Sequence, residues 1–307
     1  MDGFNHVPVL FNETIDALRV RPDGIYVDCT AGGGGHSAAV LEKLTSGHLI
    51  CIDQDPEAIA VMTERFGSDK RVTIVHDNFV NIETVLKSLG IGGVDGVMAD
   101  LGVSSHQLDT DERGFSFHKD APLDMRMSME GMTAADLVNN ASQQELQRII
   151  YTYGEEKFAS SIARNIVKAR AEHPIETTFQ LVDIIKASMP MKAKRDGHPA
   201  RKTFQALRIE VNGELEKLDK ALDGMFEALN PGGRLAVITF HSLEDRIVKK
   251  KFSSFCEGCV CPPDFPVCVC GRTPRGRLPF KSVAPSENEV DKNFRAHSAR
   301  LRAVEKL

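Results

Sequence analysis

The stretch that decides the fold is GIYVDCTAGGGGHS, residues 24–37. Residues 24–30 are apolar and β-branched for most of their length, which predicts a short buried β-strand. Four glycines, Gly32 to Gly35, then separate this strand from a segment with helical periodicity. Glycine tolerates positive φ and lets the backbone approach a ligand, and the free amides at a helix start attract polar ligands. The pattern therefore predicts a nucleotide-binding strand–loop–helix unit.

Strand-like and helix-like segments continue to alternate beyond this loop. The strand-like segments are short apolar runs, and each helix-like segment begins soon after the strand before it ends. This alternation predicts βαβ units, in which a helix returns the chain to a parallel neighbouring strand. We therefore predict an α/β fold of the Rossmann-like type with a mostly parallel sheet. The expected strands span residues 24–30, 48–53, 72–76 and 94–100, and the expected helices span 36–44, 56–66 and 82–89.

The pattern changes between residues 107 and 203, where helical periodicity continues without a convincing strand. The α/β pattern then resumes with a helix over 204–229, the turn Asn-Pro-Gly-Gly and a strand over 234–240. We expect a nucleotide-binding domain formed by residues 1–106 and 204–307, interrupted by an α-helical domain at 107–203. The expected helices of the insertion span 133–138, 143–151, 156–170 and 179–188, and a last strand is expected over 297–304.

The residues around the glycines favour S-adenosylmethionine over a dinucleotide as the ligand. A dinucleotide fingerprint needs a glycine at position 37, where this chain has Ser37. Asp28 precedes the loop, and an acid there suits the cationic amino-acid end of S-adenosylmethionine better than a pyrophosphate. Asp53 ends the second strand, where a carboxylate can hold ribose hydroxyls, although NAD enzymes place an acid there too. The alternative is a tight strand–helix turn that binds no ligand.

Two further strand ends carry candidate residues. Phe79 follows the third strand, where an aromatic ring can pack on adenine, but a core aromatic fits the position equally well. Asp100 ends the fourth strand, at the carboxyl edge where ligands of open α/β sheets bind. In a methyltransferase, a carboxylate there can accept an N–H of an exocyclic amine and stabilise the charge that develops on nitrogen. This catalytic role and a role in cofactor binding both stay open for Asp100.

Longer blocks of the chain are distinctive: HVPVLFNETIDAL (6–18), DLGVSS (100–105), PLDMRM (122–127) and TFQALR (203–208). Together they resemble the bacterial 16S ribosomal RNA cytosine-N4 methyltransferase family, small-subunit methyltransferase H or MraW, over nearly the whole chain. The resemblance implies S-adenosylmethionine-dependent methylation of the N4 amine of a cytidine in the decoding region. It makes 16S ribosomal RNA within the small subunit the partner. The family's cofactor contacts fall on Gly34, Gly35, His36, Asp53, Phe79, Asp100 and Gln107.

Within the insertion, aromatic and basic residues are candidates for RNA contacts, which makes it the expected substrate-recognition domain. Phe115 and Phe117 could stack on a flipped base, although the sequence alone favours an anchoring role in which they pack the insertion. Arg201 and Lys202 belong to a basic cluster that suits phosphate contacts. Such a charge run is ordinarily a solvated face, and it is the family resemblance that favours the phosphate contacts.

Five cysteines lie close together in the spacing C-x2-C-x-C-x6-C-x-C, at positions 256, 259, 261, 268 and 270. Thiolates at this density are compatible with a small zinc site. The spacing departs from the two C-x2-C pairs of a structural ribbon, and disulfides are disfavoured in a cytosolic enzyme. We therefore expect a loop of reduced cysteines and no metal.

The net charge of −5 over 307 residues excludes a global polycation, so any RNA affinity must come from local patches. The N-terminus lacks signal-peptide features and no apolar run is long enough to span a bilayer, so we expect a cytoplasmic location without membrane contact. The oligomeric state stays open, with a homodimer as one option. Alternative functions are a methyltransferase for a small molecule or protein and an RNA-binding assembly factor that keeps the fold without the chemistry.

Overall fold

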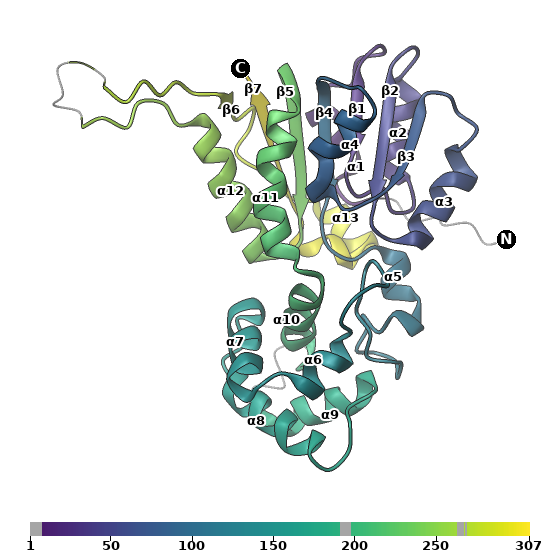
Figure 1. Ribbon diagram of the computed structural model, residues 1–307, viewed down its shortest axis with the longest axis vertical. Coiled ribbons are helices and arrows are strands. Elements are labelled where there is room, and N and C mark those ends of the chain that lie inside the picture. The colour runs from purple at the N-terminus through teal and green to yellow at the C-terminus, as the bar shows by residue number, and fades with distance from the viewer. Residues whose placement is uncertain (1–7, 191–197, 263–266, 268) are drawn as a thin grey trace. The chain divides into compact units, whose positions relative to one another are not determined.

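The chain forms two compact units in the computed structural model, which describes residues 8–190, 198–262, 267 and 269–307 (Figure 1). Unit 1 comprises Met1–Gly102 and Leu215–Leu307, and unit 2 comprises Val103–Glu214. Unit 1 is therefore discontinuous in sequence, with unit 2 inserted after its fourth strand.

Unit 1 is built on a seven-stranded sheet in the order β3-β2-β1-β4-β5-β7-β6. The first five strands in that order are parallel, and β7 is antiparallel to both of its neighbours. The predicted mostly parallel sheet is confirmed, and the expected strand near the end of the sequence is β7. The strands are β1 (Ile25–Asp28), β2 (His48–Asp53), β3 (Val72–His76), β4 (Val94–Asp100), β5 (Leu229–Thr239), β6 (Gly276–Arg277) and β7 (Arg300–Lys306).

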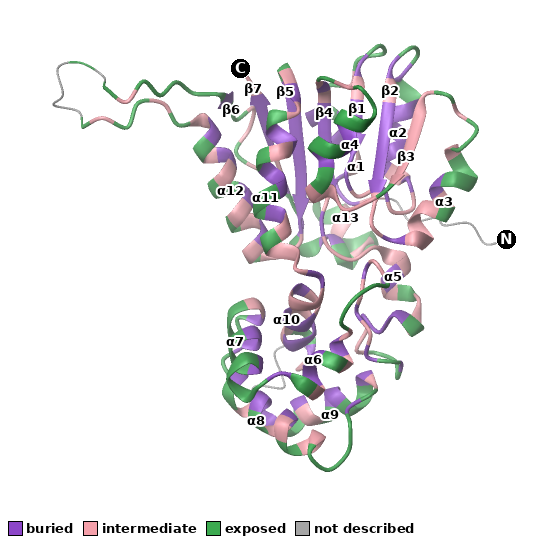
Figure 2. Ribbon diagram, viewed as in Figure 1, coloured by how far each residue is buried: buried purple, intermediate pink, exposed green. Residues whose placement is uncertain are grey.

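Helices cover both faces of this sheet, which explains the apolar runs of its strands. Successive strand residues belong to opposite hydrophobic clusters: Tyr26 lies in the cluster that includes residues of α1 and α2, whereas Val27 lies in the cluster that includes residues of α4, α11 and α12. Figure 2 shows the central strands buried along most of their length. The helices of unit 1 are α1 (Phe11–Leu18), α2 (Gly35–Lys43), α3 (Pro56–Phe66), α4 (Ile82–Ser88), α11 (Glu214–Glu227), α12 (Ser242–Cys256) and α13 (Glu287–Lys292), with 3-10 turns η1 (Phe79–Asn81) and η4 (Phe294–Ser298).

Unit 2 is helical, and none of its described residues belongs to a strand. Several of its helices begin at polar caps: Thr133, Ser142 and Thr177 each accept a hydrogen bond from a backbone amide in the first turn. Aliphatic residues from the helices form one core. The helices are α5 (Ser105–Asp109), α6 (Ala134–Asn140), α7 (Gln143–Gly154), α8 (Ala159–Arg170), α9 (Thr178–Ser188) and α10 (Arg201–Asn212), with the 3-10 turn η2 (Asp111–Arg113).

The prediction of one continuous helix over residues 204–229 is wrong. The helix ends at Asn212, and Gly213 adopts a left-handed φ of 60° before α11 starts. Its amide bonds back to the Glu210 carbonyl, as is typical of a glycine that closes a helix. The predicted Asn-Pro-Gly-Gly turn lies inside β5 as a bulge, since Leu229 pairs with Val94 and the next pairing joins Arg234 to Gly96.

None of the helices in the described part of the chain is long and apolar enough to cross a membrane.

Candidate active site

Three aspartates end three neighbouring strands at one edge of the sheet. Asp28 ends β1, Asp53 ends β2 and Asp100 ends β4. Because these strands are parallel, their carboxyl ends meet at the same edge. The strand order reverses direction between β1 and β4, and open α/β sheets bind ligands at such a reversal point. The edge therefore has the position and the charge of a ligand site.

The glycine loop, residues 31–34, joins β1 to α2 and requires glycine where it meets the helix. Gly34 is the N-cap of α2 with a φ of 76°. A Cβ atom there would lie 2.6 Å from the Met62 sulfur and 2.7 Å from the Phe66 ring. At the other end of the loop, the Gly32 amide donates to Asp53 Oδ2 at 2.8 Å. The loop is thus held in a single conformation by packing and by a strand-end carboxylate.

Asp28 is hydrogen-bonded to residues on both sides of the glycine loop. Its Oδ2 accepts a hydrogen bond from the Ser37 hydroxyl at 2.6 Å, and its Oδ1 accepts from the Thr30 amide at 3.2 Å. The side chain is buried, and this burial raises its pKa to about 6. The Ser37 that replaces the third fingerprint glycine therefore has a structural task, because it satisfies this carboxylate.

Asp53 and Phe79 lie where β2 and β3 end. The Asp53 carboxylate accepts from the Asp55 amide at 2.9 Å as well as from Gly32, and burial raises its pKa. The Asp77 amide donates to the Asp53 carbonyl at 3.0 Å, which holds the loop after β3 against the end of β2. Phe79 starts η1 and packs half-buried against the hydrophobic cluster behind it. Its ring packs against the core, and the part of the ring that stays exposed is compatible with a ligand contact.

Asp100 and His36 carry buried polar atoms without a hydrogen-bond partner among the described residues. These atoms are Asp100 Oδ1 and His36 Nε2. The other oxygen of Asp100 lies 3.7 Å from His36 Nδ1, and the Asp100 amide donates to the Thr30 hydroxyl at 2.6 Å. Burial raises the pKa of Asp100 well above its usual value, and the nearby Asp28 and Glu244 raise it further. Burial lowers the pKa of His36 to about 4, so that its imidazole is neutral at pH 7.

Glu244 and His241 are strand-end residues that the sequence analysis missed. They follow β5, the neighbour of β4, and start α12 with a reciprocal capping arrangement. Glu244 is buried, accepts from the Phe240 amide at 2.8 Å and contributes to the raised pKa of Asp100. The signal was present in the sequence: a polar N-cap with Glu three residues later, directly after an apolar strand.

Five of the predicted contacts with cofactor and substrate lie in unit 2. Gln107 lies in α5, where it completes a capping box with Ser104. Phe115 is buried in the core of unit 2, with the Arg113 guanidinium 5.9 Å from its ring centre. Phe117 is only partly buried, and its ring stacks on His198 with 4.4 Å between centroids. Thus the two phenylalanines, expected to act together, have different surroundings.

The remaining predicted RNA contacts are the first two residues of helix α10 in unit 2. Arg201 is exposed at the first position of the helix, and Lys202 follows it. The Lys202 ammonium donates to the Glu155 carbonyl at 3.1 Å. The structure therefore groups Gly34, Gly35, His36, Asp53, Phe79 and Asp100 in unit 1, and Gln107, Phe115, Phe117, Arg201 and Lys202 in unit 2.

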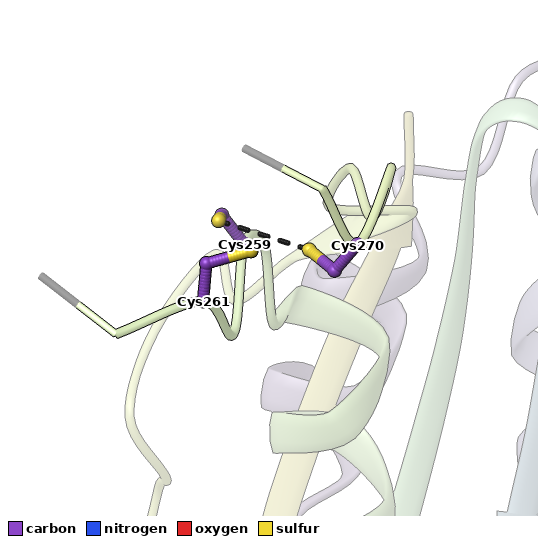
Figure 3. Close-up of side chains that lie close together, drawn as sticks. All are labelled: Cys259, Cys261 and Cys270. Atoms are coloured by element: carbon purple, nitrogen blue, oxygen red, sulfur yellow. Dashed lines mark hydrogen bonds between the residues drawn. The ribbon is translucent and has the colours of Figure 1, made fainter. Parts of the chain in front are cut away.

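Three of the five clustered cysteines converge. The sulfur atoms of Cys259, Cys261 and Cys270 all lie within 4.8 Å of one another (Figure 3). Cys256 ends α12, and Cys268 lies outside the described residues. This trio is the part of the cysteine cluster with the geometry to hold a metal ion.

Comparison of the sequence with a family model and with curated relatives gives a consistent result over nearly the whole chain. Residues 3–307 match the model of the MraW methylase family. A protein of Clostridium botulinum named ribosomal RNA small subunit methyltransferase H is 53% identical over 307 residues, 99% of both chains. The protein of the same name from Symbiobacterium thermophilum is 55% identical over 312 residues, covering 99% of this chain and 98% of its own. A solved rRNA methylase of Streptococcus thermophilus has a TM-score of 0.43 and 11% identity, covering 97% of this chain and 93% of its own.

Proposed function

This chain belongs to the MraW methylase family, and from that premise we propose that it methylates the exocyclic N4 amine of a cytidine in the decoding region of 16S ribosomal RNA. The cofactor of the family is S-adenosylmethionine, which supplies an electrophilic methyl group when bound. The observation that carries the proposal is the buried, unpartnered Oδ1 of Asp100 at the carboxyl edge of β4. An orphaned carboxylate oxygen is costly unless a ligand donates to it.

The residues at this edge fit the cofactor. Gly34 and Gly35 lie at the N-terminus of α2, where the first backbone amides of the helix can donate to a ligand. Asp53 would hold the ribose hydroxyls, and Phe79 would pack against the adenine. The neutral His36 imidazole offers Nε2 as a hydrogen-bonding atom, which matches its unsatisfied state. These assignments follow the resemblance residue by residue.

Asp100 has the chemistry that amine methylation requires. The lone pair of an exocyclic amine is delocalised into the base, so the nitrogen is a weak nucleophile. A carboxylate oxygen that accepts its N–H localises the lone pair and stabilises the positive charge that develops on nitrogen. The raised pKa makes Asp100 a better proton acceptor than an exposed aspartate, and a cation held beside it favours its ionised form.

Unit 2 would supply the contacts to RNA. Phe117 is the better candidate for stacking on a base, because its ring is only partly buried, whereas the burial of Phe115 favours a packing role. Arg201 and Lys202 add positive charge at the start of α10, where the helix dipole also favours phosphate.

The experiment that tests the proposal uses labelled S-adenosylmethionine and small ribosomal subunits from a strain that lacks the enzyme. We expect label on one cytidine, on N4, after digestion and mapping. Label on another base or position would contradict the specificity, and binding to the subunits without any transfer would favour the assembly-factor alternative. The D100N variant should retain cofactor binding and lose transfer; if it loses both together, Asp100 is a binding residue instead.

The RNA contacts are tested separately by the double variant R201Q/K202Q. We expect binding to ribosomal RNA to weaken by about tenfold and the salt dependence of log K to fall by about 2, one for each phosphate contact. Cofactor affinity should stay unchanged, because both residues lie in unit 2. The matched control is R164Q/K168Q, which removes the same charges from exposed positions of α8. Equal RNA affinity in the two double variants would exclude a specific role for Arg201 and Lys202.

A further inference from the structure

The segment over residues 257–275 carries four of the five clustered cysteines, and its described residues form no core of their own. It connects the end of α12 to β6, and its described residues form no helix or strand. Not one of these described residues is buried, and Val260, Val267 and Val269 are 54%, 69% and 73% exposed. We call this segment the cysteine arm. Small structures without enough apolar burial are held by disulfides or by a metal.

The sulfur geometry separates these two possibilities. The sulfur atoms of Cys259 and Cys270 are 3.7 Å apart, and all three sulfurs of the trio lie within 4.8 Å of one another (Figure 3). A disulfide would bring two sulfurs to about 2.05 Å. Tetrahedral zinc, with a zinc–sulfur distance of about 2.3 Å, places its sulfur ligands about 3.8 Å apart. The spacing therefore matches ligands that share an ion.

The backbone around the trio supports thiolates. The Val269 amide donates to the sulfur of Cys261 at 3.4 Å, and it spans the loop from one side of the arm to the other. A hydrogen bond to a sulfur favours its charged form. Three thiolates form a soft ligand set, which suits zinc over magnesium or calcium.

We propose that Cys259, Cys261 and Cys270 bind a structural zinc ion that fixes the cysteine arm. This replaces the expectation that the cluster holds no metal. The three thiolates supply three corners of a tetrahedron, and the fourth ligand comes from outside the trio. At its base the arm is already anchored by Arg275, whose guanidinium lies 5.5 Å from the ring centres of both Phe226 and Phe255. The ion would anchor the outer part, none of whose described residues is buried.

The test is elemental analysis of the full-length protein, purified without chelator and with reductant present. We expect about one zinc per chain in the wild type. The variant C259S/C261S/C270S should contain none, whereas C256S, which changes a neighbouring cysteine outside the trio, should retain the ion. Circular dichroism and S-adenosylmethionine binding should stay unchanged in the triple variant, which shows that loss of zinc is not loss of the fold.

Replacement of zinc by cobalt provides a second measurement. We expect thiolate-to-cobalt charge-transfer absorption and the visible bands of a tetrahedral ion in the wild type and in C256S, and neither in the triple variant. Three outcomes would overturn the proposal: wild-type protein with reduced thiols that takes up neither zinc nor cobalt, a triple variant that keeps its zinc, or iron together with inorganic sulfide. None of these results depends on methyl transfer. The zinc proposal and the proposed function can therefore fail independently of each other.

Discussion

The glycine loop and the cysteine arm are both connections within unit 1, yet they are ordered in opposite ways. The glycine loop lies between β1 and α2, and its backbone packs against Met62 and bonds to the Asp53 carboxylate. The cysteine arm lies between α12 and β6, and none of its described residues is buried. The glycine loop is fixed by the elements around it. The described residues of the cysteine arm lack such packing, and we propose that a zinc ion fixes them.

This difference predicts how strongly a substitution should destabilise each loop. In the glycine loop, a Cβ added at Gly34 would meet the side chains of Met62 and Phe66. In the cysteine arm, a Cβ added at Gly271 would have no other atom within 4 Å. Substitutions of one type, made in both loops, therefore measure the difference directly.

The largest effect is expected from alanine in place of a left-handed glycine. G34A combines a positive φ with a Cβ placed 2.6 Å from the Met62 sulfur, so we expect about 4 kcal/mol of lost unfolding free energy. G271A is the matched variant in the cysteine arm, where φ is 62° and no atom lies within 4 Å of the new Cβ. We expect it to cost about 1 kcal/mol, from backbone strain alone. Denaturant unfolding measures both losses of free energy. Equal losses in the two variants would show that the two loops do not differ in how tightly they are packed.

A smaller effect is expected from the buried charge under the glycine loop. The pKa of Asp28 is about 6 in the folded chain and about 4 in an unfolded one. The folded state therefore holds the proton more tightly, so this group's contribution to stability is complete below about pH 4 and is lost as the pH rises through 6. D28N removes the effect, and we expect it to gain about 3 kcal/mol relative to the wild type between about pH 4 and 7.

Measuring D28N as a difference from the wild type separates Asp28 from other groups. The depressed pKa of His36 acts in the opposite direction, because a histidine buried neutral adds stability as the pH rises from about 4 to 6.5. The control is E257Q, which removes an exposed carboxylate at the start of the cysteine arm. Its unfolding free energy should change with pH as that of the wild type does. A constant difference between D28N and the wild type across this range would show that Asp28 is ionised throughout.

The smallest global effect is expected from removal of the ion from the cysteine arm. A zinc chelator should make residues 257–275 sensitive to proteases and change the global unfolding free energy by less than about 1 kcal/mol. The reason is that the arm contributes none of its described residues to the core. Limited proteolysis with mass spectrometry locates the cuts, and thermal unfolding gives the global value. A large drop in the unfolding temperature would mean that the arm supports the sheet after all.

The sheet was predictable because parallel strands buried on both faces leave an uninterrupted apolar run. The strands over 48–53, 72–76 and 94–100 are confirmed at their predicted bounds. β6 was not expected, since two residues are too short to show a period. The break at Gly213 was also missed, because helical periodicity continues on both sides and an isolated glycine is tolerated within a helix.

The location of a candidate-site residue could be predicted from the sequence where the residue ends a strand. It could not be predicted where the packing of an irregular segment decides whether the side chain is buried. Asp53 and Asp100 could be located from the strands that they end. Phe115 and Phe117 are two residues apart in an irregular segment, so no period indicates that the first is buried and the second is not. The convergence of Cys259, Cys261 and Cys270 depends on how the arm folds back, which the spacing alone does not specify.

The insertion of unit 2 into unit 1 has a consequence for the order in which the molecule is made. β4 is complete at Asp100, but β5, its partner, begins at Leu229. At about 5–20 residues per second, translation of the chain between them takes on the order of ten seconds. Throughout that interval β4 is an edge strand with unpaired amides and carbonyls, the kind of edge that recruits foreign strands. We expect pauses within the insertion to lengthen this exposure and to increase aggregation of the nascent chain.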